Sequence, residues 1–266
     1  MGDDVIADSA DRFSLARRVA VVTGGAGLYG RHIADALARA GAHVVLAARD
    51  VAACERVAQT LRDSGLRASA HALDLGSEES IVALREALVD EVGRVDVLVN
   101  NAVFRQGRDP ANTTADDWRA TSAVNSTGLF LITREIGAVM VEQRSGVIVN
   151  VASMYGMVGP DFSLYRGTNM TMPAFYAYDK GGMINYTRYL ATYYAPYGIR
   201  VNCVSPGGLG TDDQPAEFVQ SYRDRVPLGR LATPDDIKGP ILFLCSDASA
   251  YVTGVNLPVD GGWTAR

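Results

Sequence analysis

One stretch constrains the fold of this chain more than any other: a buried strand that runs directly into a glycine-rich turn and then a helix. Residues 18–23 are apolar and β-branched, which predicts a first strand. Four glycines follow within residues 24–30, and Ile33, Ala34, Leu37 and Ala38 then carry the apolar spacing of a helix. Such a turn lets the backbone approach a pyrophosphate at the helix N-terminus. With a second strand expected at 43–47, the GxGxxG pattern of Gly25, Gly27 and Gly30 predicts a dinucleotide site, against the alternative of a turn without ligand.

The rest of the chain continues the alternation of short apolar strands and longer amphipathic helices. Further strands are expected at 68–73, 95–100, 146–151, 200–205 and 255–259, and helices at 51–64, 78–92, 113–140, 176–195 and 235–245. This alternation predicts right-handed βαβ units and a parallel sheet. We therefore expect an α/β fold: one Rossmann-type, doubly wound domain with a seven-stranded parallel sheet and helices on both faces. Without a repeat or linker, we expect a flexible arm at 1–14, one domain over 15–266, and a substrate flap at about 207–226.

Composition excludes several classes of function. The chain has 266 residues and a net charge of -5, which argues against nucleic acid as a partner. Its three cysteines are widely spaced, which fits a reducing compartment and predicts no metal site. The first residues are acidic rather than signal-like, and no apolar run is long enough to span a membrane. We expect a cytoplasmic protein.

The end of the second strand bears on the choice of cofactor. An acidic residue at this strand tip binds the ribose 2′-hydroxyl of NAD, whereas an arginine accommodates the 2′-phosphate of NADP. The expected tip is Ala48, and Arg49 follows it, so we favour NADP(H) over NAD(H). Asp50 leaves the choice open, because a shift of one residue reverses the interpretation.

Three polar residues stand out further along the chain. Asp74 follows the third strand, where it could cap the next helix or bond the adenine of a nucleotide. Asn125 lies inside a helical pattern and needs either solvent or a specific partner. Ser153 follows the fifth strand, at the edge where ligands bind in parallel sheets, although a serine there is also an ordinary turn residue.

Tyr176 and Lys180 are four residues apart near the start of a predicted helix. Residues at i and i+4 share a helix face, so the phenol and the ammonium can point into one cleft. A cation about 4 Å from a phenol is worth roughly 4 kcal/mol at an effective dielectric of about 20. That is on the order of three pKa units, enough to make a tyrosine useful in proton transfer. An amphipathic helix with an unrelated surface lysine is the competing interpretation.

Together these features resemble the short-chain dehydrogenase/reductase family, from about Leu15 to Trp263. The family's TGxxxGxG motif falls on Thr23, Gly24 and Gly30, its NNAG motif on Asn100, Asn101 and Ala102, and its proline-glycine motif on Pro206, Gly207 and Thr211. The resemblance implies a catalytic tetrad formed by Asn125, Ser153, Tyr176 and Lys180. It implies cofactor contacts from Gly24, Gly27, Leu28, Tyr29, Gly30, Arg49, Asp74, Leu75, Asn101, Ala102, Tyr176, Lys180, Pro206, Gly207, Leu209 and Thr211.

The sequence departs from the family pattern at three places. Leu28 replaces the middle glycine of the first motif, with Gly27 beside it, and Val103 replaces the last glycine of NNAG. The stretch between Ser153 and Tyr176 is longer than usual. Tyr165 lies within this insertion, but no lysine follows four residues later, so Tyr176 remains the expected acid. The insertion shapes the substrate pocket or is an ordinary surface loop. The candidate substrate contacts are Val103, Met154, Tyr165, Gly208 and Gln214.

The resemblance implies hydride transfer between a nicotinamide and a carbonyl or secondary alcohol. Tyr176 would exchange the proton, Lys180 would lower its pKa and hold the ribose, Ser153 would bind the substrate oxygen, and Asn125 would position a relay water. A polyol, keto-sugar or sugar acid is the expected substrate. A 3-oxoacyl thioester reductase is the alternative, an apolar ketone the third choice, and a non-catalytic dinucleotide sensor the alternative of another class. In the family the helices that correspond to 115–140 and 176–197 pair across a two-fold axis, so the resemblance implies a homotetramer, with a dimer second. The many tyrosines of 176–197 agree with an interface.

Overall fold

A single sheet of seven parallel strands forms the centre of the molecule. The computed structural model describes residues 10–105 and 109–266. The strands are β1 Val19–Thr23, β2 His43–Ala48, β3 Arg67–Ala72, β4 Val97–Asn100, β5 Gly146–Val151, β6 Ile199–Pro206 and β7 Asn256–Val259. Their order is β3-β2-β1-β4-β5-β6-β7, and every pair of neighbours is parallel. The strand order runs outward from β1 to β3 on one side and from β4 to β7 on the other, which confirms the doubly wound fold.

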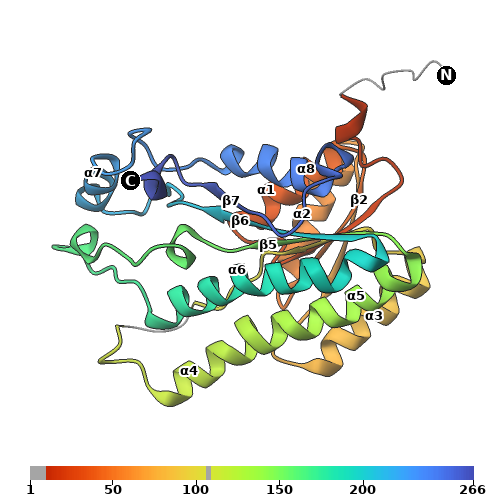
Figure 1. The fold of residues 1–266 in the computed structure, drawn as a ribbon, viewed down its shortest axis with the longest axis horizontal. Coiled ribbons are helices and arrows are strands. Elements are labelled where there is room, and N and C mark those ends of the chain that lie inside the picture. Colours follow the sequence, from red (N-terminus) through yellow and green to blue (C-terminus); the bar gives the residue numbers. More distant parts are fainter. Residues whose placement is uncertain (1–9, 106–108) are drawn as a thin grey trace.

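Helices cover both faces of the sheet (Figure 1). They are α1 Gly30–Arg39, α2 Val51–Asp63, α3 Glu78–Val92, α4 Ala115–Ser122, α5 Leu129–Gln143, α6 Ala174–Tyr194, α7 Ala216–Arg223 and α8 Lys238–Cys245. Helices α1, α2 and α8 lie on one face, and α3, α5 and α6 on the other. Helix α7 lies apart from both layers, beyond the sheet edge that carries the functional residues.

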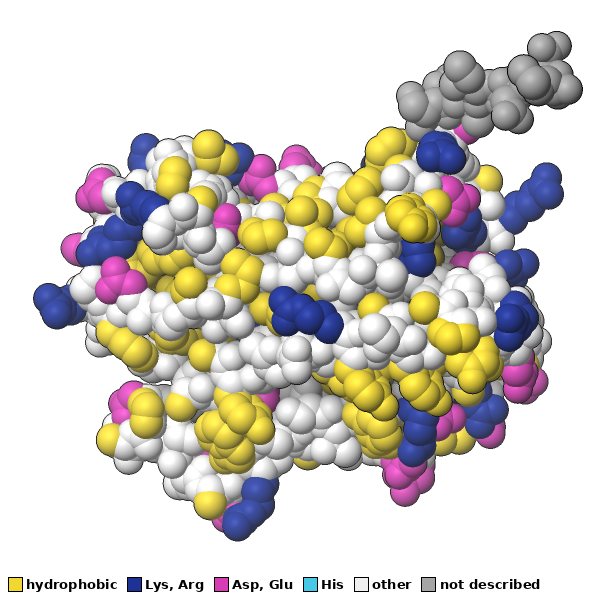
Figure 2. Space-filling view, viewed as in Figure 1, with side chains coloured by type: hydrophobic (Ala, Val, Ile, Leu, Met, Phe, Trp, Pro, Cys, Tyr) yellow, Lys and Arg dark blue, Asp and Glu magenta, His cyan; other side chains and the backbone are white. Residues whose placement is uncertain are grey.

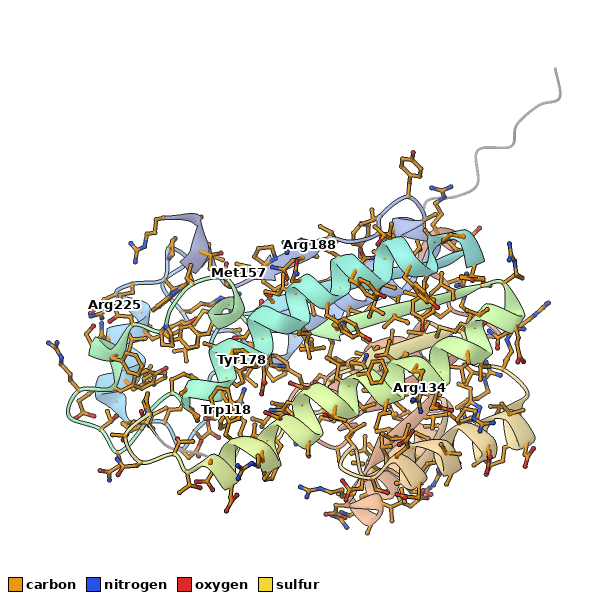
Figure 3. All side chains as sticks on the ribbon, turned by 60° about the horizontal axis from the view of Figure 1, so that its bottom comes forward. Trp118, Arg134, Met157, Tyr178, Arg188 and Arg225 are labelled. Carbon is orange, nitrogen blue, oxygen red and sulfur yellow. The ribbon has the colours of Figure 1, made fainter. Side chains whose placement is uncertain are left out.

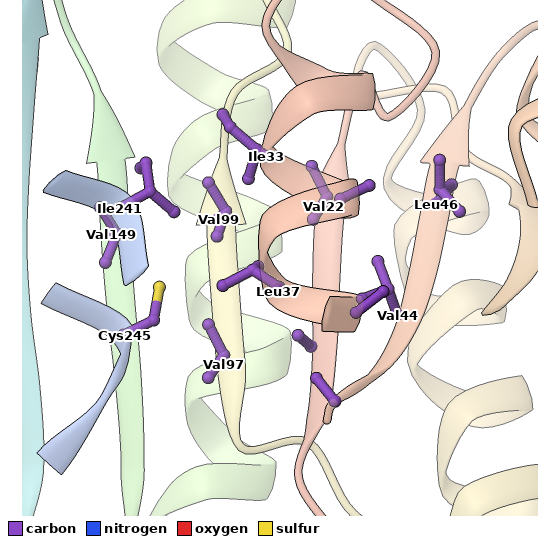
Figure 4. Close-up of a cluster of buried hydrophobic side chains, with 14 of the residues drawn as sticks. Val22, Ile33, Leu37, Val44, Leu46, Val97, Val99, Val149, Ile241 and Cys245 are labelled. Carbon is purple, nitrogen blue, oxygen red and sulfur yellow. The ribbon is translucent and has the colours of Figure 1, made fainter. Parts of the chain in front are cut away.

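Each face of the sheet has its own hydrophobic core. In Figure 4, Ile33 and Leu37 of α1 and Ile241 of α8 pack over β-branched residues of the central strands. Alternate residues of the same strands, such as Val21 and Leu98, pack on the opposite face. A strand buried on both faces must be apolar at every position, which is why these strands appear in the sequence as continuous hydrophobic runs.

The expected helix at 113–140 is not one regular helix. Residues Ala123–Gly128 form a π-helical segment between α4 and α5. A π segment widens the turn by one residue and is frequent at functional sites. Here it contains Asn125, so the widened turn directs a motif residue toward the sheet edge.

The insertion before α6 consists of two 3-10 turns, Met154–Gly156 and Phe162–Tyr165. Arg225, just beyond α7, donates to Asp161 at 2.8 Å and to Ser163 Oγ at 2.9 Å. The insertion and the flap are therefore joined to each other above the sheet edge, and Arg225 marks that junction in Figure 3.

The expected arm at 1–14 lies only partly within the described residues, because residues 1–9 are outside them. Asp11–Phe13 form a 3-10 turn, and Leu15, the first residue of the expected domain, is fully buried. Among the described residues, no helix is both long and apolar enough to cross a bilayer.

Figure 2 shows hydrophobic side chains gathered over α5 and α6. Exposed aromatic residues there include Tyr178, Tyr189, Tyr193 and Phe130.

Candidate active site

Tyr176 and Lys180 face the same cleft from the first turns of α6. Both side chains are buried, and the Lys180 ammonium lies 5.8 Å from the centre of the Tyr176 ring. Lys180 Nζ donates to the carbonyl of Val151 at 2.6 Å, which ties the helix to the end of β5. Burial lowers the pKa of Lys180, while the neighbouring Tyr176 opposes that shift.

Arg105, a residue that no sequence motif indicated, also contacts Tyr176. Its Nη2 donates to the tyrosine hydroxyl at 3.0 Å, and its guanidinium lies 4.9 Å from the ring centre. Burial alone raises the pKa of Tyr176, but Lys180 and Arg105 outweigh it, with hydrogen bonds from Ser153 and Arg105 adding to their effect. The pKa of Tyr176 therefore lies below that of an ordinary phenol. Opposite charge and hydrogen bonding to the ionised form both act in this direction.

Ser153 stands at the carboxyl end of β5, as expected. It is buried, it helps to lower the pKa of Tyr176, and its hydroxyl accepts from the backbone N–H of Tyr155 at 3.2 Å. The hydroxyl of the competing acid, Tyr165, lies 3.2 Å from that of Tyr155, and its ring stacks on Phe218. Burial raises the pKa of Tyr165, whereas that of Tyr176 is lowered.

Asn125 has the specific partners expected of an asparagine inside a helix. Its Oδ1 accepts from the backbone N–H of Phe104 at 2.8 Å, and its Nδ2 donates to the Phe104 carbonyl at 3.0 Å. The same Nδ2 donates to the buried carboxylate of Asp179 at 2.9 Å. Ser126 Oγ also donates to Asp179, at 3.3 Å. Asn125 therefore fixes the loop after β4, and Asp179, which sequence reasoning passed over, fixes Asn125.

A small cavity of about 10 Å³ lies between these groups. It is lined by Asn125, Tyr176, Asp179 and Lys180. This volume is about the smallest that accommodates one water molecule, and the lining offers the polar partners a water needs. The geometry is compatible with a water between Asn125 and Lys180.

The glycine-rich turn forms a cradle that side chains would fill. A Cβ on Gly30 would lie 2.1 Å from the carbonyl oxygen of Gly24, and one on Gly24 would lie 2.9 Å from Ala102 Cα. Gly24 also has a positive φ of 64°, which favours glycine. Leu28, at the place of the missing glycine, is 54% exposed and has no positive φ. Its side chain is accommodated by pointing outward, so the turn can retain its shape.

Other predicted cofactor contacts surround this turn. Asn101 Nδ2 donates to the carbonyls of Thr23 and Gly24 at 2.9 and 3.1 Å, and the Ala102 N–H donates to Thr23 Oγ1. These bonds hold the loop after β4 against the turn. The hydroxyl of Tyr29 is buried and has no hydrogen-bond partner in the described part of the chain. An unpartnered buried hydroxyl near Tyr176 fits a site completed by a bound polar group.

The ends of β2 and β3 carry three residues, Arg49, Asp50 and Asp74, for which the sequence left two interpretations open. β2 ends at Ala48, Arg49 follows it, and the Asp50 carboxylate accepts from Ala53 N–H at 2.9 Å as the N-cap of α2. At the end of β3, Asp74 does not cap α3, because Ser77 holds that position. Asp74 instead accepts from the Gly76 N–H at 2.9 Å, and Leu75 is buried in the core.

The flap after β6 is held mainly by its own hydrogen bonds. The Gly207 N–H donates to Val259 at 3.0 Å, and the Gly208 N–H to the Tyr222 hydroxyl at 2.7 Å. Gln214 accepts from the Thr211 N–H and donates to the Leu209 carbonyl, at 3.1 and 2.9 Å. Both ends of its amide are thus engaged within the flap, so any substrate contact by Gln214 would use the remaining lone pair or N–H of this amide.

Two further substrate candidates, Met154 and Val103, have apolar side chains and offer no hydrogen bond to a substrate. Met154 is buried against Tyr222, while Val103 is 37% exposed at the cleft. Within residues 10–105 and 109–266, no group of three His, Cys, Asp or Glu could hold a metal ion. The three cysteines are free and buried.

Comparison with known proteins agrees with this geometry. Residues 27–264 match the family model described as enoyl-(acyl carrier protein) reductase. The chain is 39% identical to the cis-4-hydroxycyclohexanecarboxylate dehydrogenase of Sinomonas cyclohexanicum, covering 95% of this chain and 98% of the relative. It is 34% identical to the 3-oxoacyl-[acyl-carrier-protein] reductase FabG of Aquifex aeolicus, covering 92% and 96%.

The chain belongs to the short-chain dehydrogenase/reductase family. It is an NAD(P)-dependent oxidoreductase that acts on CH–OH groups or the corresponding carbonyls.

Solved structures of this family include both cofactors. A gluconate 5-dehydrogenase from Burkholderia cenocepacia in complex with NADP and tartrate superposes with a TM-score of 0.87, at 30% identity over 97% of this chain and 99% of that one. A xylitol dehydrogenase bound to NAD+ gives 0.84, at 32% identity over 93% and 99%. The family likeness therefore establishes a nicotinamide cofactor without deciding between the two.

Proposed function

We propose that this enzyme interconverts a secondary alcohol and a ketone in a hydroxylated substrate, a polyol, keto-sugar or sugar acid, and that it uses NADP(H) in preference to NAD(H). The observation that carries the assignment is that Tyr176 shares a buried site with Lys180, that Arg105 donates to its hydroxyl, and that these two cations lower its pKa. The named activities of the gluconate, galactitol and hydroxycyclohexanecarboxylate dehydrogenases support the substrate class.

The proton is handled by Tyr176. In oxidation its ionised hydroxyl accepts the alcohol proton, and in reduction the protonated form donates to the developing alkoxide. Ser153 stabilises the substrate oxygen by a hydrogen bond as charge develops there. Lys180 stabilises the phenolate, and a water between Lys180 and Asn125 returns the proton to solvent. When bound, the nicotinamide supplies or accepts the hydride.

The chain's own residues fit that cofactor. The α1 N-terminus and the turn at Gly24 and Gly30 would hold the pyrophosphate. Arg49 at the tip of β2 would neutralise a 2′-phosphate, and Asp50 is already occupied as a helix cap. Pro206, Gly207, Leu209 and Thr211 lie on the strand end and flap that would border the nicotinamide.

Two measurements test the proposal. Fluorescence titration with NADPH and NADH should show NADPH binding tighter by about tenfold, which corresponds to about 1.4 kcal/mol. Equal or reversed affinities would refute the cofactor preference. Turnover should be found among polyols, keto-sugars and aldonates, whereas turnover of an acetoacetyl thioester alone would favour the 3-oxoacyl reductase that FabG relatives represent.

We also propose a homotetramer in the cytoplasm. The exposed rings of Tyr178, Tyr189 and Tyr193 on α6 support self-association, because aromatic side chains are enriched at interfaces. Figure 3 shows Tyr178 beside Trp118 of α4, and their ring centres are 5.4 Å apart. The free, buried cysteines support a reducing compartment. Light scattering of the purified protein measures the assembly.

A further inference from the structure

Arg105 carries a positive charge that the described structure does not neutralise. Its side chain is exposed, and its one hydrogen-bond acceptor within residues 10–105 and 109–266 is the Tyr176 hydroxyl. A guanidinium has five N–H donors, so most of its capacity is unused in these contacts. Two other arginines near the cleft differ: Arg225 is paired with Asp161, and Arg230 with Asp236.

The position of Arg105 is fixed at both ends. Asn125 bonds both the N–H and the carbonyl of the preceding residue, Phe104, which anchors the backbone. At the other end, the guanidinium is bonded to the Tyr176 hydroxyl and lies over its ring. Attraction between the cation and the aromatic face favours this position of the side chain.

A hydrophobic cluster packs against Tyr176, and it includes Met154, Tyr155, Tyr165 and Tyr222. The second cation of the site, Lys180, is 4% exposed and bonded to Val151 behind the tyrosine. Arg105 is thus the accessible cation beside Tyr176 in the described part of the site.

We infer that Arg105 binds a carboxylate of the substrate, located one or two carbons from the reacting carbon. The inference rests on the proposed function and narrows its substrate class to hydroxy acids and keto acids. The reacting oxygen must lie within hydrogen-bond distance of the Tyr176 hydroxyl, which is itself 3.0 Å from the guanidinium. A carboxylate α or β to that carbon comes within reach of the free N–H groups, which match its two oxygens in a bidentate pair.

Matched acids and neutral compounds test this inference. We would measure kcat/KM for reduction of 2-keto-D-gluconate against D-fructose, which differ at C1 as carboxylate and CH₂OH. Acetoacetate and 4-hydroxy-2-butanone form the corresponding β pair. In the wild type, the acid should be preferred by about 10- to 100-fold in at least one pair, the range expected for a charge-assisted hydrogen bond.

The variants separate substrate binding from a general effect on catalysis. Arg105→Met should reduce the acid-to-neutral ratio to near one, and Arg105→Lys should retain part of it. Arg56→Met, which removes an equally exposed arginine on α2, should leave the ratio unchanged. A readout without turnover is calorimetric binding of D-gluconate and D-glucitol to the complex with oxidised cofactor, where Arg105→Met should abolish the preference for gluconate.

The outcomes distinguish this inference from the proposed function. If Arg105→Met slows acid and neutral compounds equally, Arg105 acts on Tyr176 alone and the carboxylate site is refuted, while hydride transfer stands. An acid-to-neutral ratio near one in the wild type also refutes the site. If cofactor binds but none of the four ketones turns over and neither ligand binds, the proposed substrate class fails and this inference fails with it.

Discussion

Arg105 Nη2 lies 3.0 Å from the hydroxyl of Tyr176, on a ring that Lys180 approaches to 5.8 Å. Two cations therefore act on one phenol, one from the loop after β4 and one from the tyrosine's own helix. Both favour the ionised form, and together they overcome a burial that alone would favour the neutral form.

Replacing Tyr176 with Phe should remove proton transfer and leave the cofactor site intact. We expect turnover to fall by about 100-fold or more, because general acid–base catalysis contributes this much. Cofactor affinity, measured by fluorescence, should change little. Near-normal turnover would exclude Tyr176 as the acid.

Replacing Arg105 with Met should change the pH dependence of alcohol oxidation. Oxidation needs the phenolate, so kcat rises as pH increases through the pKa of Tyr176. Removing a cation and a hydrogen bond that stabilise the phenolate raises this pKa, and the rise in kcat should move to higher pH. An unchanged kcat profile in the variant would show that Arg105 does not act on the tyrosine.

Gly30→Ala should disrupt the turn that faces the cofactor. The added Cβ would lie 2.1 Å from the Gly24 carbonyl oxygen, so the backbone must move. Gly27→Ala is the matched control, because its Cβ would lie 3.1 Å from the same atom and a small adjustment suffices. We expect at least about tenfold weaker cofactor binding for Gly30→Ala than for Gly27→Ala, and equal affinities would contradict the cradle.

Arg49 and Asp50 should have different effects despite being neighbours. Asp50→Ala removes the α2 cap and should cost about 1 kcal/mol of stability with little change in the NADPH-to-NADH affinity ratio. Arg49→Gln should reduce that ratio and leave stability unchanged. Chemical denaturation and cofactor titration of both variants measure this, and the reverse pattern would assign the ribose contact to Asp50.

Asp179→Asn should alter stability in a pH-dependent way. Burial raises the pKa of Asp179, so the folded state retains this proton to a higher pH than the unfolded chain. This raised pKa adds to the free energy of unfolding of the wild type below the unfolded pKa of about 4. The added stability is lost as pH rises through the folded pKa. In chemical denaturation between pH 4 and 7, the free energy of unfolding of the variant should rise relative to that of the wild type as pH increases. A difference between the two proteins that does not change with pH would contradict this.

The regular parts of this fold were predictable because each strand is buried on both faces. β5 and α3 begin and end where the apolar pattern predicted, and the glycine turn placed the cofactor edge. Tyr176, Lys180 and Ser153 were also predictable, since helix spacing and strand ends alone bring them to one edge. The NADP(H) preference, the homotetramer and the individual site roles remain predictions.

What the sequence did not reveal depends on irregular backbone. Arg105 lies in a loop whose course is set by Asn125, twenty residues later, and no periodic pattern encodes such a contact. The π segment at Ala123–Gly128 also lay outside the regular helical pattern, and two of its side chains, Asn125 and Ser126, bond to Asp179 of another helix. Gln214 and Tyr165 carry functional groups suited to a substrate, but hydrogen bonds formed only on folding engage them within the protein.

The amide of Asn125 holds Phe104 by both backbone groups, and the next side chain along reaches the reacting centre. The backbone of Phe104 is thus held in place, while the side chain of the next residue, Arg105, faces the substrate. Position 105 can therefore be substituted while Asn125, Ser153, Tyr176 and Lys180 keep their places. Substitution of this one residue is a route to changing the substrate specificity of the enzyme.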